Sequence, residues 1–133
     1  MRQKKLSFTT FNLYNLNEPG IRIYNDRDGW DHAQYEAKID WASNILRDQP
    51  SDVFGFQELW HKASLENAFV NAGLDDQYEL LVPEGHAGSH IVCAGAVRKE
   101  LLVGEPEWIT NFPDYFKLES GGDDAQTSDI AVQ

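Results

Sequence analysis

The chain has 133 residues, 41% of them apolar, with four Trp, seven Phe and five Tyr. That content suffices for one hydrophobic core, so we expect a single domain over residues 1–133. Eleven basic against 22 acidic residues leave a net charge of −11, which repels phosphate backbones and argues against nucleic-acid binding by charge alone. A bound phosphate would need another source of positive charge, and a divalent cation is the obvious candidate.

The single cysteine, Cys93, excludes an internal disulfide, and its apolar neighbours predict that it is buried. The basic start "MRQKK" is followed by residues too polar for a signal peptide, and no run approaches membrane-spanning length. We therefore expect a cytoplasmic protein, although a chain trimmed at its start would look the same.

The first predicted element is a strand. Apolar and polar residues alternate in "KLSFTTFN", residues 5–12, which predicts a strand that ends near Asn12. The polar residues 15–29 contain Pro-Gly and Asp-Gly and read as a long loop. Loops of that length in compact domains are often functional.

A helix is expected next, with Asp31 as its N-cap, Gln34 completing a capping box and an end before Pro50. Its apolar stripe comprises Tyr35, Ile39, Ala42, Ile45 and Leu46. The apolar run "DVFGFQ", residues 52–57, then predicts a strand buried on both faces. This strand is expected to end on Glu58.

A second helix is expected within residues 64–74, with Gly73 as its C-cap. Two strands over 78–83 and 90–99 follow, joined by a Gly-rich loop. Further strands are predicted to begin at "LLV", 101–103, and at "IAVQ", 130–133, on either side of a tail of flexible composition. Strands alternating with helices predict an α/β fold.

Asn12 and Glu58 stand at the predicted ends of two strands that a crossover helix can place side by side. Side chains at such strand ends emerge at one sheet edge, where α/β folds usually hold their sites. A carboxylate beside an amide oxygen is a plausible partial shell for Mg²⁺. The alternative is that Glu58 is a solvated surface residue and that Asn12 merely caps the loop.

Other chemistries find little support in the sequence. The four histidines lack zinc-like spacing, and no Gly-x-Ser-x-Gly elbow or phosphate-binding loop is present. His61, His86 and His90 lie near Glu58 or the Gly-rich loop, but their positions assign them no role.

"FTTFNLYNL", residues 8–16, followed after a helix by "SDVFGFQEL", residues 51–59, resembles the start of the endonuclease/exonuclease/phosphatase superfamily, the deoxyribonuclease-I-like fold. "AGAVRKELLV", residues 94–103, is similar to the superfamily's next strand pair, and the resemblance spans most of residues 6–103. The stretch "FQELWHKASLENAF" looks like a bacterial branch.

This resemblance implies a divalent-metal-dependent phosphoester hydrolase. Glu58 would bind Mg²⁺ or Mn²⁺, and Asn12 would bind the metal or orient the phosphate. Water would be the nucleophile. The substrate stays open between nucleic acid and a small phosphodiester or phosphomonoester, with the negative charge favouring a small one.

The chain departs from the superfamily in its second half. A Gly-Asp-x-Asn segment is echoed only by Gly122-Asp123 with Ala125 in place of Asn, and a Ser-Asp-His segment ends on Ile130 in place of His. We therefore expect the N-terminal half of a two-sheet α/β sandwich: a mixed sheet with helices on its outer face, inactive by itself. The uncovered sheet face is expected to be buried by self-association or domain swapping, or by the missing half of the fold. The competing reading is a non-catalytic α/β binding module in which Asn12 and Glu58 are structural.

Overall fold

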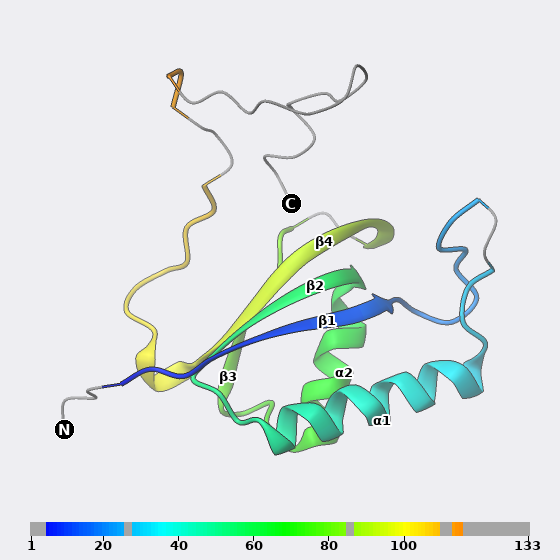
Figure 1. Cartoon of the computed structure of the whole chain (residues 1–133), viewed down its shortest axis with the longest axis horizontal. Helices are drawn as coiled ribbons and strands as arrows, with labels where there is room; N and C mark the ends of the chain where they lie inside the picture. The colour runs from blue at the N-terminus through cyan, green and yellow to red at the C-terminus, as the bar shows by residue number, and fades with distance from the viewer. Residues whose placement is uncertain (1–4, 26–27, 85–86, 110–112, 116–133) are drawn as a thin grey trace.

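The computed structural model describes residues 5–25, 28–84, 87–109 and 113–115. Their centre is a four-stranded sheet of order β1-β2-β4-β3 (Figure 1). Its strands are β1 (Phe8–Leu16), β2 (Val53–His61), β3 (Tyr78–Leu81) and β4 (Ala87–Arg98). β1 and β2 pair in parallel, and the other two pairings are antiparallel. The expected mixed sheet of an α/β fold is confirmed.

Helix α1 (His32–Asp48) makes the crossover between the two parallel strands. Its predicted capping box is present: the Asp31 carboxylate accepts from the Gln34 amide at 2.7 Å, and the Gln34 side chain accepts from the Asp31 amide at 2.9 Å. Helix α2 (Lys62–Ala72) ends at Gly73, whose left-handed φ of 74° makes it the predicted C-cap.

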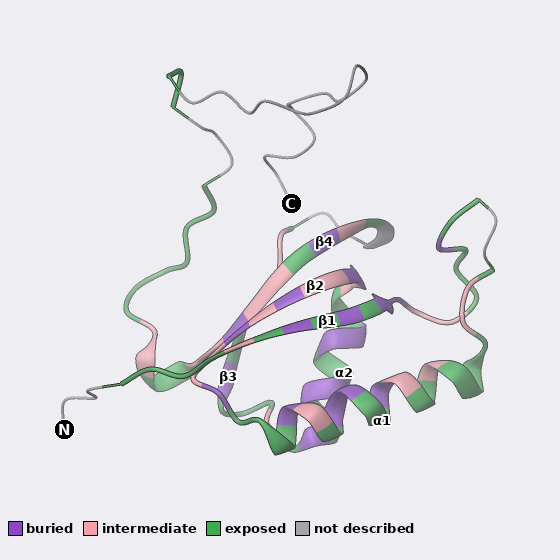
Figure 2. Ribbon diagram, in the orientation of Figure 1, coloured by how far each residue is buried: buried purple, intermediate pink, exposed green. Residues whose placement is uncertain are grey.

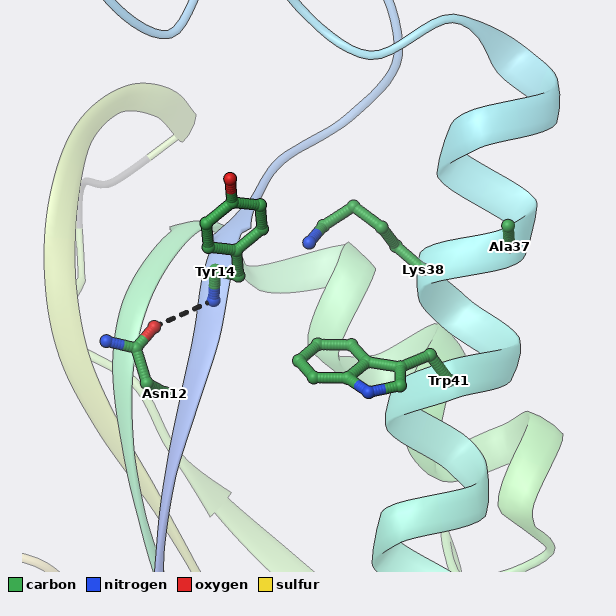
Figure 3. A pocket seen from close by; sticks show the side chains of 5 residues that line it. All are labelled: Asn12, Tyr14, Ala37, Lys38 and Trp41. Carbon is green, nitrogen blue, oxygen red and sulfur yellow. Dashed lines mark hydrogen bonds between the residues drawn. The ribbon is translucent and has the colours of Figure 1, made fainter.

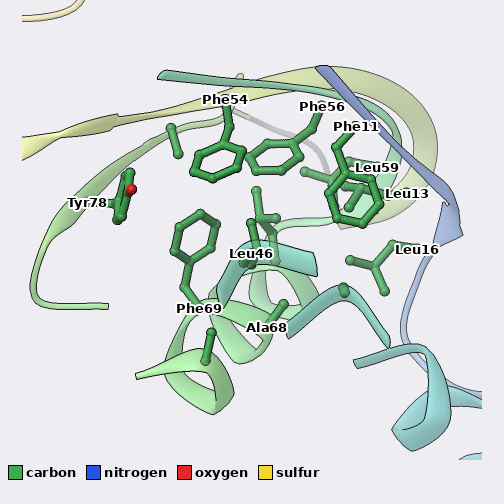
Figure 4. Close-up of a cluster of buried hydrophobic side chains, with 14 of the residues drawn as sticks. Phe11, Leu13, Leu16, Leu46, Phe54, Phe56, Leu59, Ala68, Phe69 and Tyr78 are labelled. Atoms are coloured by element: carbon green, nitrogen blue, oxygen red, sulfur yellow. The ribbon is translucent and has the colours of Figure 1, made fainter. Parts of the chain in front are cut away.

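Both helices cover the same face of the sheet, and the core lies between them and the strands (Figures 1 and 2). Phe54 and Phe56 of β2 stack at 5.6 Å, and both rings meet Phe69 of α2 edge-on (Figure 4). Each buried Phe stabilises the fold by about 1.5–3 kcal/mol. This one-sided core matches the expectation of helices on one face only.

Apart from the ends of β1 and β2, which are described below, three sequence predictions are wrong. Residues 52–57 are not buried on both faces, because Phe54 and Phe56 are buried while the residues that alternate with them, 53, 55 and 57, are half-exposed. Cys93 is exposed, because β4 alternates and its buried neighbour Val92 points toward the helices. Residues 101–103 form no strand, since β4 is followed by a 3-10 turn, η1 (Lys99–Leu101).

Several predictions fall outside the described residues, namely His86, the tail containing Gly122, Asp123 and Ala125, and the strand expected at 130–133. Within the described part of the chain, neither helix has the length and apolar character needed to cross a membrane.

Candidate functional site

Asn12 and Glu58 lie on neighbouring parallel strands, as predicted, but neither residue ends its strand. Regular pairing runs from Phe8 opposite Val53 to Asn12 opposite Gln57, and it then breaks. Pairing resumes with Leu16 opposite Leu59, so residues 13–15 of β1 face Glu58 alone. We call residues 13–15 the bulge. Both strands continue beyond the two candidate residues.

The backbone at the break is left-handed on both strands. Tyr14 and Asn15 have φ values of 51° and 55°, and Glu58 has a φ of 61°. Such a conformation costs a non-glycine residue about 1–2 kcal/mol, although Asn tolerates it better than most. The described part of the chain contains no further left-handed residue apart from glycines. The strain is thus concentrated where the candidate residues lie.

The bulge binds both candidate side chains. The Tyr14 amide donates to Oδ1 of Asn12 at 2.8 Å, and the Asn15 amide donates to Oε2 of Glu58 at 3.2 Å. Among the described residues, no donor reaches Oε1 of Glu58, and the carbonyl oxygen of Asn12 keeps a second lone pair. Asn12 is exposed and Glu58 is half-buried, so solvent reaches the pair.

Asn15 anchors the bulge in the core and is itself 4% exposed. Its Oδ1 accepts from the Trp60 indole at 3.0 Å and from the Tyr24 hydroxyl at 3.1 Å. Its backbone carbonyl accepts from the Trp30 indole at 2.8 Å. Three ring donors, two from the connection between β1 and α1 and one from β2, therefore fix one residue of the bulge.

The side chain of Lys38 extends from α1 toward Tyr14 of the bulge (Figure 3). Its ammonium lies 4.8 Å from the ring centres of Tyr14 and Trp30 and 5.2 Å from that of Trp41. It also donates to the Leu13 carbonyl at 3.2 Å. Burial lowers the pKa of Lys38 to about 8, an effect that the negative charge of Glu58 opposes.

A cavity of about 500 Å³ opens between α1 and β1 beside this ammonium. Its lining residues are Asn12, Tyr14, Ala37, Lys38 and Trp41 (Figure 3). The ring of Trp41 packs edge-on against Phe11 at 5.2 Å. We call the rings of Tyr14, Trp30 and Trp41, which surround the Lys38 ammonium, the aromatic cage. The cavity therefore adjoins one of the two candidate residues.

The described histidines do not join this pair. His61 lies 3.7 Å from the Glu18 carboxylate and 3.0 Å from the Ser64 hydroxyl. His32 pairs with Glu36 on the surface of α1, and His90 is exposed. The described residues contain no group of three or more His, Cys, Asp or Glu side chains able to hold a metal.

Sequence reasoning missed Asn15 and Lys38. Asn15 could have been found from "YNLN", because Asn favours left-handed backbone and interrupts a strand pattern there. Lys38 lies three residues after Tyr35 and so shares the sheet-facing side of the helix, which was a usable signal. Its aromatic cage draws on three separate segments and has no local signature.

No protein-family model matches the chain, and no curated protein matches it. Among solved structures, the chain is similar to the endonuclease/exonuclease/phosphatase from Bacteroides vulgatus, at 14% sequence identity and a TM-score of 0.45. The match covers 71% of this chain and 32% of that protein, so the chain spans about a third of its length. That protein bears the superfamily name which the sequence motifs indicate. A likeness at this level does not show the function of this chain.

Proposed function

We propose that the chain carries part of the metal site of a divalent-metal-dependent phosphoester hydrolase. The observation that carries the proposal is the binding of Asn12 and Glu58 by consecutive amides of a strained bulge. Strained, non-glycine backbone persists only where the surroundings enforce it, and it clusters at functional sites. Bulges are likewise frequent beside active sites, where they redirect a side chain.

The donor set fits a hard cation such as Mg²⁺ or Mn²⁺. Oε1 of Glu58 supplies a charged oxygen, and Oδ1 of Asn12 supplies a neutral one that can still accept a second interaction. Mg²⁺ is commonly held by one or two carboxylates and retains several waters. A cation bound there would polarise a phosphoryl oxygen of the substrate and stabilise the leaving group.

The chain's own residues hold and orient this pair. The Asn15 amide fixes Oε2 of Glu58, and Oε1 accepts no hydrogen bond from the described residues. The Tyr14 amide orients the side chain of Asn12. Rigid support of this kind is what a ligand needs to keep its geometry. Residues 1–133 contain neither of the two second-half segments that the resemblance implies, so we expect the chain alone to bind the cation weakly without turning over a phosphoester.

The net charge of −11 favours a small phosphoester over a nucleic acid, because a polyanion would be repelled along its whole length. A longer protein containing this chain would carry the activity. The choice between nuclease, phosphodiesterase and phosphatase depends on residues beyond the pair.

The competing function is a non-catalytic binding module in which Asn12 and Glu58 only stabilise the bulge. Its specific support is that both side chains already accept a backbone hydrogen bond. This reading requires an acceptor at position 58 but not a charge.

A titration with Mg²⁺ or Mn²⁺, followed by tryptophan fluorescence, separates the two functions. Trp30 and Trp60 both donate to Asn15, so their emission reports on the bulge. We expect saturable cation binding by the wild type and none by Glu58→Gln, which keeps an acceptor oxygen and loses the charge. The matched control is Glu79→Gln, on the exposed face of β3, and it should bind as the wild type does. Equal binding by Glu58→Gln and wild type would support the binding-module reading.

In a longer, active protein, Glu58→Ala should abolish metal-dependent hydrolysis while the protein stays folded. Asn12→Ala should impair hydrolysis less, because an amide contributes a dipole and not a full charge. Near-normal turnover by Glu58→Ala would remove Glu58 from the site.

A further inference from the structure

Lys38 is the cation that lies against the bulge, and its contacts differ from those of a surface lysine. A surface lysine keeps its ammonium in water, whereas this one faces three aromatic rings and the Leu13 carbonyl. Attraction between a cation and an aromatic ring is worth about 0.5–1 kcal/mol when exposed and more when desolvated. Its contacts therefore favour one position of the side chain.

The groups that Lys38 contacts belong to the bulge or to its anchor. Leu13 and Tyr14 are two of the three bulge residues, and Trp30 donates to the carbonyl of the third, Asn15. The Asn15 amide in turn donates to Glu58. A short chain of contacts thus leads from the Lys38 ammonium to the Glu58 carboxylate.

We propose that Lys38 is a positioning residue for Glu58: its caged ammonium holds the bulge in the left-handed conformation that presents the Asn15 amide to the carboxylate. The inference rests on the proposed function, because the purpose of positioning Glu58 is cation binding. Its physical content, however, is the order of the bulge, and this can be measured without a metal.

Two effects of opposite sign make the inference testable. The positive charge of Lys38 acts on Glu58 and should oppose a divalent cation bound there. If charge were its only influence, Lys38→Met would tighten cation binding. If Lys38 positions Glu58, the same substitution weakens binding, because the carboxylate loses its support.

The experiment compares Mn²⁺ affinity by calorimetry in three variants of the full chain. Lys38→Met keeps the length of the side chain and removes the ammonium, and we expect it to weaken binding about tenfold, as substitutions behind a metal ligand commonly do. Lys38→Arg keeps a cation that stacks well on aromatic rings, and its affinity should stay close to the wild-type value. Lys99→Met, in η1, removes the same charge away from the cage and should leave binding unchanged. Unchanged or tighter binding by Lys38→Met would overturn the inference.

Hydrogen exchange in the absence of metal supplies a second readout. The Asn15 amide is expected to exchange faster in Lys38→Met than in the wild type, while the Gly73 amide, bonded to Val70 in α2, exchanges as before. If the wild type binds no cation, the proposed function fails, yet faster exchange at Asn15 would still support the role of Lys38. Unaltered exchange at Asn15 would reject that role whatever the metal result.

Discussion

Asn12 and Glu58 come from different strands, but their side chains accept hydrogen bonds from the consecutive amides of Tyr14 and Asn15, at 2.8 and 3.2 Å. The two candidate residues are thus joined through the bulge and not through direct strand pairing, since Asn12 lies opposite Gln57. Any change that reshapes the bulge should therefore affect both. Whether the pair shares one cation remains a prediction.

The first prediction concerns the backbone of Asn15. Asn15→Ala and Asn15→Gly both remove the acceptor of the Trp60 indole, and an unsatisfied buried donor costs about 1–3 kcal/mol. Alanine must also adopt the φ of 55°, which costs about 1 kcal/mol more than it does for glycine. Urea unfolding should therefore rank the wild type first, Asn15→Gly second and Asn15→Ala last. Equal stability of the two variants would show that Asn15 carries no strain.

The second prediction follows from the Lys38 pKa of about 8, which burial lowers and the Glu58 carboxylate raises. Loss of the proton removes the cation from Trp30 and Trp41, so tryptophan fluorescence should change with a midpoint near pH 8. Lys38→Met should lack this transition. A midpoint above pH 10, or one that persists in Lys38→Met, would contradict the burial of the ammonium.

The same pKa fixes the direction of a stability change. Below pH 8 the folded and unfolded chains both hold the Lys38 proton, and the folded chain bears the cost of burying it. Between pH 8 and about 10.5 the unfolded chain retains a proton that the folded chain has lost, so stability rises with pH. The free energy of unfolding of the wild type, relative to Lys38→Met, should therefore increase across this window.

Local signals in the sequence predicted the elements well. The capping box at Asp31 and the C-cap at Gly73 depend on neighbouring residues only, and both are confirmed. The two-sided burial predicted for residues 52–57 failed because an apolar run does not reveal whether the second face of a sheet is covered. The prediction that Cys93 is buried failed for the same reason, since Cys93 lies on the face of the sheet that the helices leave open.

The sequence predicted the two residues of the candidate site, Asn12 and Glu58, but not the bulge that binds them. Strand order and the crossover helix were enough to bring Asn12 and Glu58 to neighbouring strands. The bulge depends on long-range contacts, such as the Trp60 indole on Asn15, which lies 45 residues away in sequence. Sequence periodicity carries no information on such contacts, so both strands were expected to stop where they in fact change conformation.

The third prediction uses the glycine pair at the centre of the sheet, Gly55 opposite Gly95. A Cβ on Gly95 would lie 3.1 Å from the Phe54 carbonyl oxygen, whereas a Cβ on Gly55 would meet nothing within 4 Å. Gly95→Ala should therefore destabilise the chain. Gly55→Ala should leave it unchanged or stabilise it by about 0.5–1 kcal/mol, because glycine within a strand is unfavourable. Thermal unfolding of both variants tests this difference.

Gly55→Ala also tests whether residues 1–133 are an incomplete part of a larger domain. In this chain the open face of β2 has room for a methyl group. If a second sheet packs on that face in a longer protein, the same substitution should destabilise the longer protein, because packed sheets leave no such space. Equal effects in both proteins would count against a second sheet over Gly55.

The last prediction concerns the open face itself, where Phe8 is 69% exposed and the single cysteine, Cys93, is also exposed. Self-association through this face would cover both side chains. The reaction rate of Cys93 with a thiol reagent should then fall as protein concentration rises, in step with the mass measured by sedimentation. Phe8→Asn removes an exposed ring without disturbing the core and should keep Cys93 reactive at high concentration. A monomer at all concentrations, with constant Cys93 reactivity, would mean that the mixed polar and apolar face is stable in water. The physical argument for a missing partner sheet would then be lost, while the proposed cation site, on the bulge, would still stand or fall by the Glu58→Gln titration.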